Sequence, residues 1–255
     1  MLLVIDVGNT NTVIGVYDGE ILKYDWRIRT IRDTTADEFN VLANALFSDK
    51  GIVRSTIQKT AISSVVPSSV PILNAYCEKY LGLSPLWINP DSVKKLMPIL
   101  YHNPNEVGAD RIVNAVAAYR KYKTSLIVID FGTATTLDVI SEKGEYIGGA
   151  IVPGVMISAE ALFQRASRLP RVEIFKAPDT VIGRDTIDSI KSGLIYGNAA
   201  MVDGMVERMA KEMNSTPRII ATGGIAPLIS GLSKTIEKVE PSLTLDGLRI
   251  ISNEM

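Results

Sequence analysis

The 255-residue chain lacks several of the residues on which common protein sites depend. Cys77 is its only cysteine, so an internal disulfide is excluded and a reducing compartment is permitted. His102 is its only histidine, which rules out a two-histidine zinc site; beside Tyr101 and Pro104 it indicates a loop hydrogen-bonder more than a catalyst. Any acid–base chemistry therefore falls to a carboxylate.

A sizeable net charge and long apolar runs are also missing. The formal net charge is −1, which leaves no electrostatic footprint for nucleic acid or an anionic membrane surface. The N-terminus has no basic segment followed by an apolar stretch, and no uncharged apolar run approaches the roughly 20 residues that span a bilayer. We expect a soluble, cytoplasmic protein that binds neither nucleic acid nor membrane.

The common nucleotide-binding loops are absent, but one short segment occurs twice. Neither G-x-x-x-x-G-K-[ST] nor G-x-G-x-x-G after a strand is found. Instead, Val4 to Thr12 reads VIDVGNTNT and Val128 to Thr136 reads VIDFGTATT, which places Asp6 and Asp130 124 positions apart. Each copy is an apolar strand that ends in an aspartate, a glycine and a run of hydroxyl or amide side chains. Such a turn offers backbone N–H groups and a carboxylate to a phosphate and its metal ion.

Similar segments follow each copy. Both copies precede a β-hairpin, with Asp18-Gly19 or Lys143-Gly144 at the turn. Alternating helix-like and strand-like runs follow in each half. The pattern predicts an α/β protein of two similar domains, residues 1–122 and 123–255, with both Asp-x-Gly turns facing one cleft.

The expected helices and strands are as follows. Helical spacing predicts one helix after the capping box formed by Thr35 and Glu38, and further helices at residues 70–80, 109–122, 156–166 and 186–213. A break of the last helix near Gly197 is an alternative. Strand-like runs cover 60–66, 86–89, 126–130, 218–222 and 249–251.

Two further segments are candidates for a site. Thr222-Gly223-Gly224 follows an apolar run, where glycines allow a ligand to approach the backbone. A plain strand-to-helix turn explains this segment better when it stands alone, and a binding role gains weight only beside the two Asp-x-Gly turns. Tyr101 to Arg111 gathers an aromatic hydroxyl, amides, carboxylates and an arginine before a helix. Asp110 there is suited either to capping the helix or to catalysis.

These motifs together resemble those of type III pantothenate kinases. The resemblance rests on Asp6 to Thr12, Gly108 to Arg111 (GADR), Asp130 to Thr136 and Gly148 to Gly154 (GGAIVPG), and it covers nearly the whole chain. It implies the duplicated ribonuclease H-like fold of the actin, sugar kinase and heat-shock chaperone superfamily. It also implies ATP-dependent phosphorylation of pantothenate, the first step of coenzyme A synthesis, by a phosphotransferase with an alcohol acceptor.

The resemblance further implies a role for each candidate residue. Asp110 would be the catalytic base, Asp6 would hold Mg²⁺ directly or through water, and Asp130 would bind a monovalent cation, potassium or ammonium. A homodimer is also implied, with the region of Thr186 near the partner's site. The remaining ATP-binding candidates are Val7, Gly8, Asn9, Thr10, Asn11, Thr12, Val13, Thr133, Gly223 and Gly224, and the pantothenate candidates are Tyr101, Gly108, Ala109, Asp110, Arg111 and Thr186.

Two other functions stay open from the sequence. One is another small-molecule kinase or phosphatase of the superfamily, and the other is an ATP-binding regulatory or transcriptional accessory protein of the same fold. Asp110 argues mildly against a pure binder, since binding alone needs no base.

Overall fold

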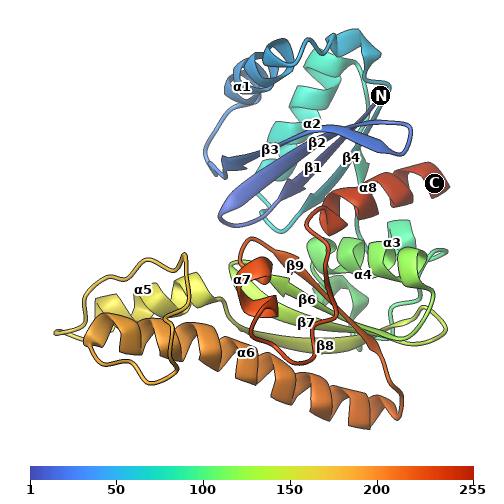
Figure 1. Ribbon diagram of the computed structural model, residues 1–255. Coiled ribbons are helices and arrows are strands. Elements are labelled where there is room, and N and C mark those ends of the chain that lie inside the picture. The colour runs from blue at the N-terminus through green and yellow to red at the C-terminus, as the bar shows by residue number, and fades with distance from the viewer. The chain divides into compact units, whose positions relative to one another are not determined.

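The chain divides into two compact units, each built on a five-stranded sheet. The computed structural model describes all 255 residues; one unit comprises residues 1–117 and 243–255, and the other residues 118–242. Figure 1 shows the helices and strands of both.

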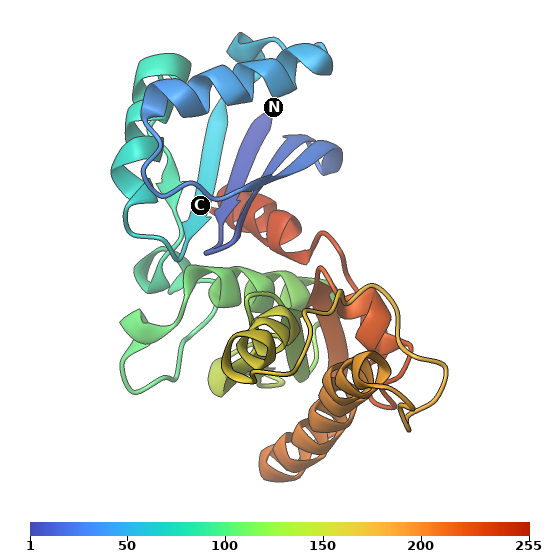
Figure 2. The same ribbon diagram turned by 90° about the vertical axis from the view of Figure 1, so that its left-hand side faces the viewer.

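The first unit carries a mixed sheet with helices on both faces. Its strands are β1 (Leu2–Val7), β2 (Asn11–Asp18), β3 (Ile21–Arg29), β4 (Lys59–Ser64) and β5 (Leu86–Trp87). Its helices are α1 (Ala36–Asp49), α2 (Ser69–Tyr76), α3 (Pro90–Val93), α8 (Leu243–Glu254) and the start of α4 (Ala109–Tyr122), with short turns η1 (Arg54–Thr56), η2 (Cys77–Leu81) and η3 (Pro104–Glu106). Residues of α1 and α2 pack on the face of β1 that carries Leu3 and Ile5, and α8 packs on the face that carries Val4 (Figure 2).

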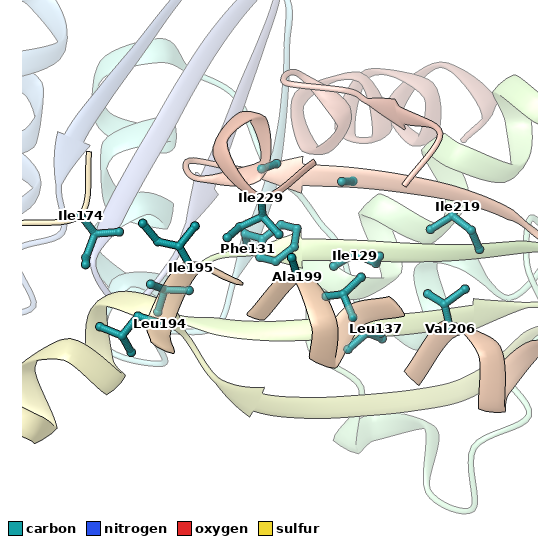
Figure 3. Close-up of a cluster of buried hydrophobic side chains, with 14 of the residues drawn as sticks. Ile129, Phe131, Leu137, Ile174, Leu194, Ile195, Ala199, Val206, Ile219 and Ile229 are labelled. Atoms are coloured by element: carbon teal, nitrogen blue, oxygen red, sulfur yellow. The ribbon is translucent and has the colours of Figure 1, made fainter. Parts of the chain in front are cut away.

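The second unit repeats this plan. Its strands are β6 (Leu126–Phe131), β7 (Ala134–Ile140), β8 (Tyr146–Pro153), β9 (Arg218–Gly223) and β10 (Lys238–Val239). Its helices are α5 (Val155–Arg165), α6 (Thr186–Met213), α7 (Ala226–Ser230) and the end of α4. In Figure 3, Leu194, Ile195 and Ala199 of α6 lie in one buried cluster with Ile129 and Phe131 of β6.

The two sheets have the same topology. Their strand orders are β3-β2-β1-β4-β5 and β8-β7-β6-β9-β10 when read from corresponding edges. In each, the first strand pairs antiparallel with the second and parallel with the fourth. The two sheets also share an irregularity: the strand register shifts between Val16 and Tyr17 in the first sheet and between Val139 and Ile140 in the second. The sequence repeat is therefore a repeat of the fold.

The first turn of the repeat is one residue longer in the first copy. Asp6 pairs with Val13 across β1 and β2, whereas Asp130 pairs with Thr136 across β6 and β7. Structurally, Thr136 thus corresponds to Val13, although the sequence repeat aligns it with Thr12. Side chains opposite the two aspartates differ as a consequence.

Most local expectations match the structure. The capping box is present, with Glu38 N 3.2 Å from Thr35 Oγ1 and Thr35 N 2.8 Å from Glu38 Oε2. The expected hairpins form with Gly19 and Gly144 at positive φ, 60° and 81°. Helix α6 runs unbroken through Gly197, so the alternative of a break there is wrong.

The strand expected at 249–251 is also wrong, because these residues lie within α8. Leu248 and Ile251 are buried on one side of this helix together with Leu243 and Leu245. The apolar run around Ile251 is thus part of a helical stripe, and the short β10 takes the fifth strand position.

Helix α8 also changes the division of the chain. Tyr17 Oη donates to Asp246 Oδ1 at 2.8 Å, and Thr244 Oγ1 donates to Asn114 Oδ1 at 2.7 Å. These contacts, with Leu245 against β2, fasten the C-terminal helix to the N-terminal unit. Compactness therefore places 243–255 with 1–117, in contrast to the expected division at residue 122.

Candidate active site

The first Asp-x-Gly turn joins β1 to β2 and is held from β3. Gly8 N donates to Asn11 O at 3.0 Å, closing the turn. Thr30, just after β3, donates its hydroxyl to Gly8 O at 2.7 Å and lies 2.9 Å from the hydroxyl of Thr12. Asn9 and Thr10 are exposed at the tip. The turn is thus a hydrogen-bonded loop with a polar tip, as a phosphate-binding turn requires.

A cation from the neighbouring loop reaches this tip. Arg32 Nη2 donates to Asn9 Oδ1 at 3.1 Å. An arginine beside an exposed turn of this kind suits phosphate oxygens, because its donors are fixed in one plane.

Asp6, near the end of β1, is a carboxyl group with a strongly raised pKa. Ser63 on the neighbouring β4 donates to its Oδ1 at 2.6 Å. Burial, together with the negative charge of Asp110, raises the pKa of Asp6 from its ordinary 3.8 to about 7, against the lowering effects of Ser63 and Arg27. A cation at this carboxylate would relieve both causes, because it replaces lost solvation and offsets the neighbouring charge.

Asp110 lies at the start of α4, and its charge acts on Asp6 although 104 residues separate them. Its Oδ1 accepts a hydrogen bond from the backbone N–H of Arg111 at 2.8 Å, so the carboxylate does contact the first turn of the helix. A Cβ at Gly108 would stand 2.6 Å from that oxygen, so glycine there leaves room for it. The structure thus brings the Gly-Ala-Asp-Arg segment and the first turn together.

The other residues of this segment differ in exposure. Ala109 and Arg111 are buried, Tyr101 and Gly108 are partly buried, and His102 is exposed.

The second Asp-x-Gly turn joins β6 to β7 and lies against the start of α5. Gly132 N donates to Ala134 O at 3.1 Å, and Gly154 N donates to Thr133 O at 3.2 Å. A Cβ at Gly154 would lie 2.3 Å from Thr133 O, so only glycine permits this approach. Thr133 itself is exposed. Glycine at the end of the Gly-Gly-x-Ile-x-Pro-Gly motif thus has a direct structural cause.

Asp130 ends β6, directly opposite Thr136 on β7 and beside Thr222 on β9. A Cβ at Gly223, which has φ of +97°, would lie 2.7 Å from Asp130 Oδ1 and 2.5 Å from Phe131 O. Gly223 is therefore required by the packing around Asp130. Gly224 is exposed and would meet no atom within 4 Å, so its glycine has no such cause.

Thr186 is the first residue of α6, and it borders a separate concavity. Asp185 caps the helix by accepting from Asp188 N at 2.8 Å. The concavity has a volume of about 750 Å³ and is lined by Thr186, Ser189 and Gly193 of α6 with Leu162 and Leu169.

Sequence reasoning missed several residues that hold the site in place. Thr30, Arg32 and Ser63 act on the first turn, and Asp138 and Tyr146 lie behind the second. No local signal marks them, because each meets its partner only through strand pairing or loop packing. Among the described residues, no group of three or more His, Cys, Asp and Glu side chains is arranged to hold a metal ion. None of the helices is both long enough and apolar enough to cross a membrane.

Solved structures with a similar fold indicate the structural class of this chain. A glucokinase of the ROK family from Streptomyces griseus, solved with glucose and AMPPNP, aligns with a TM-score of 0.58 at 14% identity and covers 99% of this chain and 100% of its own. A Campylobacter jejuni protein assigned to the Baf family of transcriptional activators aligns with a TM-score of 0.61 at 17% identity, covering 99% and 98%. The fold is thus the duplicated ribonuclease H-like fold of actin-like ATPases and sugar kinases, as expected.

Sequence comparison narrows the class to a family. The model of the type III pantothenate kinase family matches residues 2–208. A type III pantothenate kinase of Desulforapulum autotrophicum is 70% identical over 100% of this chain and 97% of its own, and that of Geobacter sulfurreducens is 56% identical over 98% of each. The chain belongs to the type III pantothenate kinase family, and the expected class of enzyme, a kinase, is confirmed.

Proposed function

We propose that this protein transfers the γ-phosphoryl group of ATP to the hydroxyl of pantothenate, giving 4'-phosphopantothenate in the first step of coenzyme A synthesis. The observation that carries the proposal is that the carboxylates of Asp6 and Asp110 lie close enough for one charge to act on the other. A carboxylate suited to a metal-bound phosphate lies within electrostatic reach of a second carboxylate on another element. Phosphoryl transfer to an alcohol needs both a held phosphate and an acceptor for the hydroxyl proton.

ATP binding falls to the two repeated turns. Asp6 to Val13 would hold the phosphates through backbone N–H groups and hydroxyls, and Thr133 of the second turn would contact them as well. Gly223 and Gly224 would let the nucleotide approach the backbone. The exposed tips at Asn9, Thr10 and Thr133 support these roles.

Cations fit both aspartates. The raised pKa of Asp6 reflects a carboxylate short of counter-charge, which Mg²⁺ with its water shell would supply when bound with ATP. At Asp130 a potassium or ammonium ion would meet a carboxylate flanked by the hydroxyl-bearing Thr136 and Thr222. Each cation would offset phosphate charge.

Asp110 would take the proton of the pantothenate hydroxyl, with Tyr101, Gly108, Ala109 and Arg111 around the substrate. Arg111 could hold the pantothenate carboxylate or the phosphoryl group in transit, since its donors suit either. Thr186 would complete the pocket in a homodimer.

An apolar surface around α5 and α6 supports the homodimer. Exposed apolar side chains there include Phe163 at 43%, Phe175 at 82%, Ile182 at 79% and Ile187 at 46%. Several such side chains in one region are typical of an interface. The concavity beside Thr186 lies in the same region, so a second copy would cover both.

A coupled ADP-release assay, with and without pantothenate and over several potassium concentrations, tests the proposal. ADP release that requires pantothenate, with other small alcohols inactive, is the expected result. Release with a different alcohol would favour another kinase of the superfamily. ATP binding without any release would favour a regulatory, ATP-binding protein of this fold. A cytoplasmic location suits a kinase of this kind.

A further inference from the structure

A buried carboxylate on β7 has no role in the function proposed above. Asp138 is fully buried, and it accepts hydrogen bonds from Tyr146 Oη at 2.6 Å and from Thr136 Oγ1 at 3.0 Å. Burying a carboxylate costs free energy even when it is hydrogen-bonded. A residue of this kind calls for a reason beyond packing.

The first copy of the repeat shows that the fold does not need this carboxylate. In register, Asp138 pairs with Val128 as Gly15 pairs with Val4, and Thr136 pairs with Asp130 as Val13 pairs with Asp6. The first copy thus has valine and glycine where the second has threonine and aspartate. The polar chain, meaning the hydrogen-bonded side chains of Thr136, Asp138 and Tyr146, is therefore found only in the second copy.

The polar chain ends at the side of the sheet that carries Asp130. Ile129, Phe131 and Leu137 lie in the cluster packed by α6, so Asp130, Thr136 and Asp138 point to the opposite face. Directly opposed residues of antiparallel strands have Cβ atoms about 4.5–5.5 Å apart. The hydroxyl of Thr136 and the carboxylate of Asp130 are therefore neighbours.

The hydrogen bond to Asp138 decides what Thr136 presents to this neighbour. A threonine hydroxyl has one proton, and here Asp138 accepts it. The oxygen of Thr136 is left with lone pairs only. An oxygen of this kind beside a carboxylate is suited to a cation, because hard cations bind oxygen ligands.

We propose that Asp138 is a positioning residue of the monovalent-cation site at Asp130, and that it makes Thr136 Oγ1 a ligand by holding the threonine proton on the far side. The inference rests on the proposed role of Asp130. Tyr146 donates to the same carboxylate and is itself fully buried.

The test measures potassium binding by the full-length protein apart from turnover. The melting temperature is followed against KCl at fixed Mg·ADP, with choline chloride keeping the ionic strength constant, and the midpoint concentration is compared between variants. Asp138→Asn has one accepting oxygen for two hydroxyl donors. Because Tyr146 is buried, we expect the amide to donate to Thr136 and turn the threonine proton toward the cation. Loss of an outer-shell partner typically weakens metal binding about 10–100-fold, so the midpoint should rise by that factor.

Matched variants separate positioning from folding. Tyr146→Phe removes a hydrogen bond to the same carboxylate and should lower stability while leaving the potassium midpoint within about twofold. Thr136→Ser keeps the hydroxyl and should retain the wild-type midpoint, whereas Thr136→Val should raise it as Asp138→Asn does. If Asp138→Asn does not fold, the Thr136 pair still decides whether Thr136 Oγ1 is the ligand that the inference requires.

Several outcomes would overturn the inference. An unchanged midpoint in Thr136→Val excludes Thr136 as a ligand, and an unchanged midpoint in folded Asp138→Asn excludes positioning by Asp138. A wild-type protein without a potassium response that still phosphorylates pantothenate would refute the inference and leave the kinase assignment intact. A normal potassium response without any pantothenate turnover would do the reverse.

Discussion

Asp6→Asn is expected to stabilise the ligand-free protein while it abolishes productive Mg·ATP binding. The change keeps the size of the side chain, and its oxygen can still accept from the Ser63 hydroxyl, which lies 2.6 Å from Asp6 Oδ1. The new amide can donate toward Asp110, whose charge raises the pKa of Asp6. Functional sites often hold such unfavourable groups at a cost in stability.

The magnitude follows from the pKa of Asp6. A value of about 7 in the folded protein, against 3.8 ordinarily, means that ionising Asp6 costs the folded state on the order of 4 kcal/mol. Local relaxation would reduce the realised gain, so 4 kcal/mol is the upper end. For a chain of this size, each kcal/mol changes the melting temperature by about 2–4 °C.

The pH dependence gives the prediction its sign. Between about pH 4 and pH 7 folded Asp6 holds a proton that the unfolded chain has lost, so this contribution to stability disappears as the pH rises through that window. Asp6→Asn does not titrate there. The stability gained by the variant should be small near pH 4 and should level off above pH 7. Thermal unfolding in chelator, without nucleotide, at intervals from pH 4 to 8.5 measures it.

Two further variants should move the curve in opposite directions. Asp110→Asn removes a charge that raises the pKa of Asp6, so the pH at which stability is lost should be lower than in the wild type. Ser63→Ala removes a hydrogen bond that lowers it, so the loss should move to higher pH. A stability gain in Asp6→Asn that is the same at every pH, or a loss at pH 8, would refute the reasoning.

Three other predictions concern activity, packing and assembly. Asp110→Asn should lower kcat by about 10²–10⁴-fold with ATP affinity little changed, and near wild-type turnover would leave Asp110 only its contact with the helix start. Gly223→Ala should lower the melting temperature and activity, because its Cβ would lie within 2.7 Å of a carboxylate oxygen, while Gly224→Ala meets no atom within 4 Å and serves as the control. Ile187→Glu should dissociate the proposed dimer in sedimentation experiments, whereas Ile21→Glu, at a side chain 62% exposed in the other unit, should not; a monomer with full activity in the wild type would exclude the dimer.

Much of the fold follows from local patterns in the sequence. Apolar strands, positive-φ glycines at 19 and 144, and the Thr35 capping box each act over a few residues, so the sequence alone fixes them. The repeat around Asp6 and Asp130 survives in sequence because both copies form the same strand, turn and strand. Type and order of most elements could therefore be predicted, together with the family.

Long-range packing decided the rest. The 249–251 run looks like a strand by itself, and only its burial against the first sheet shows it to be part of a helix. The sequence repeat also aligns Thr136 with Thr12, whereas strand register pairs it with Asp130, because one turn is a residue longer. No spacing rule predicts such a shift.

The electrostatics of the candidate site likewise needed tertiary structure. Asp6, Ser63 and Asp110 come from three separate elements, and their mutual effect on the pKa of Asp6 exists only once β1, β4 and the start of α4 are packed together. The sequence determined which carboxylates and turns were available, since local motifs encode them. The fold determined which groups share protons and charge, because those energies depend on distances that the order of residues does not contain.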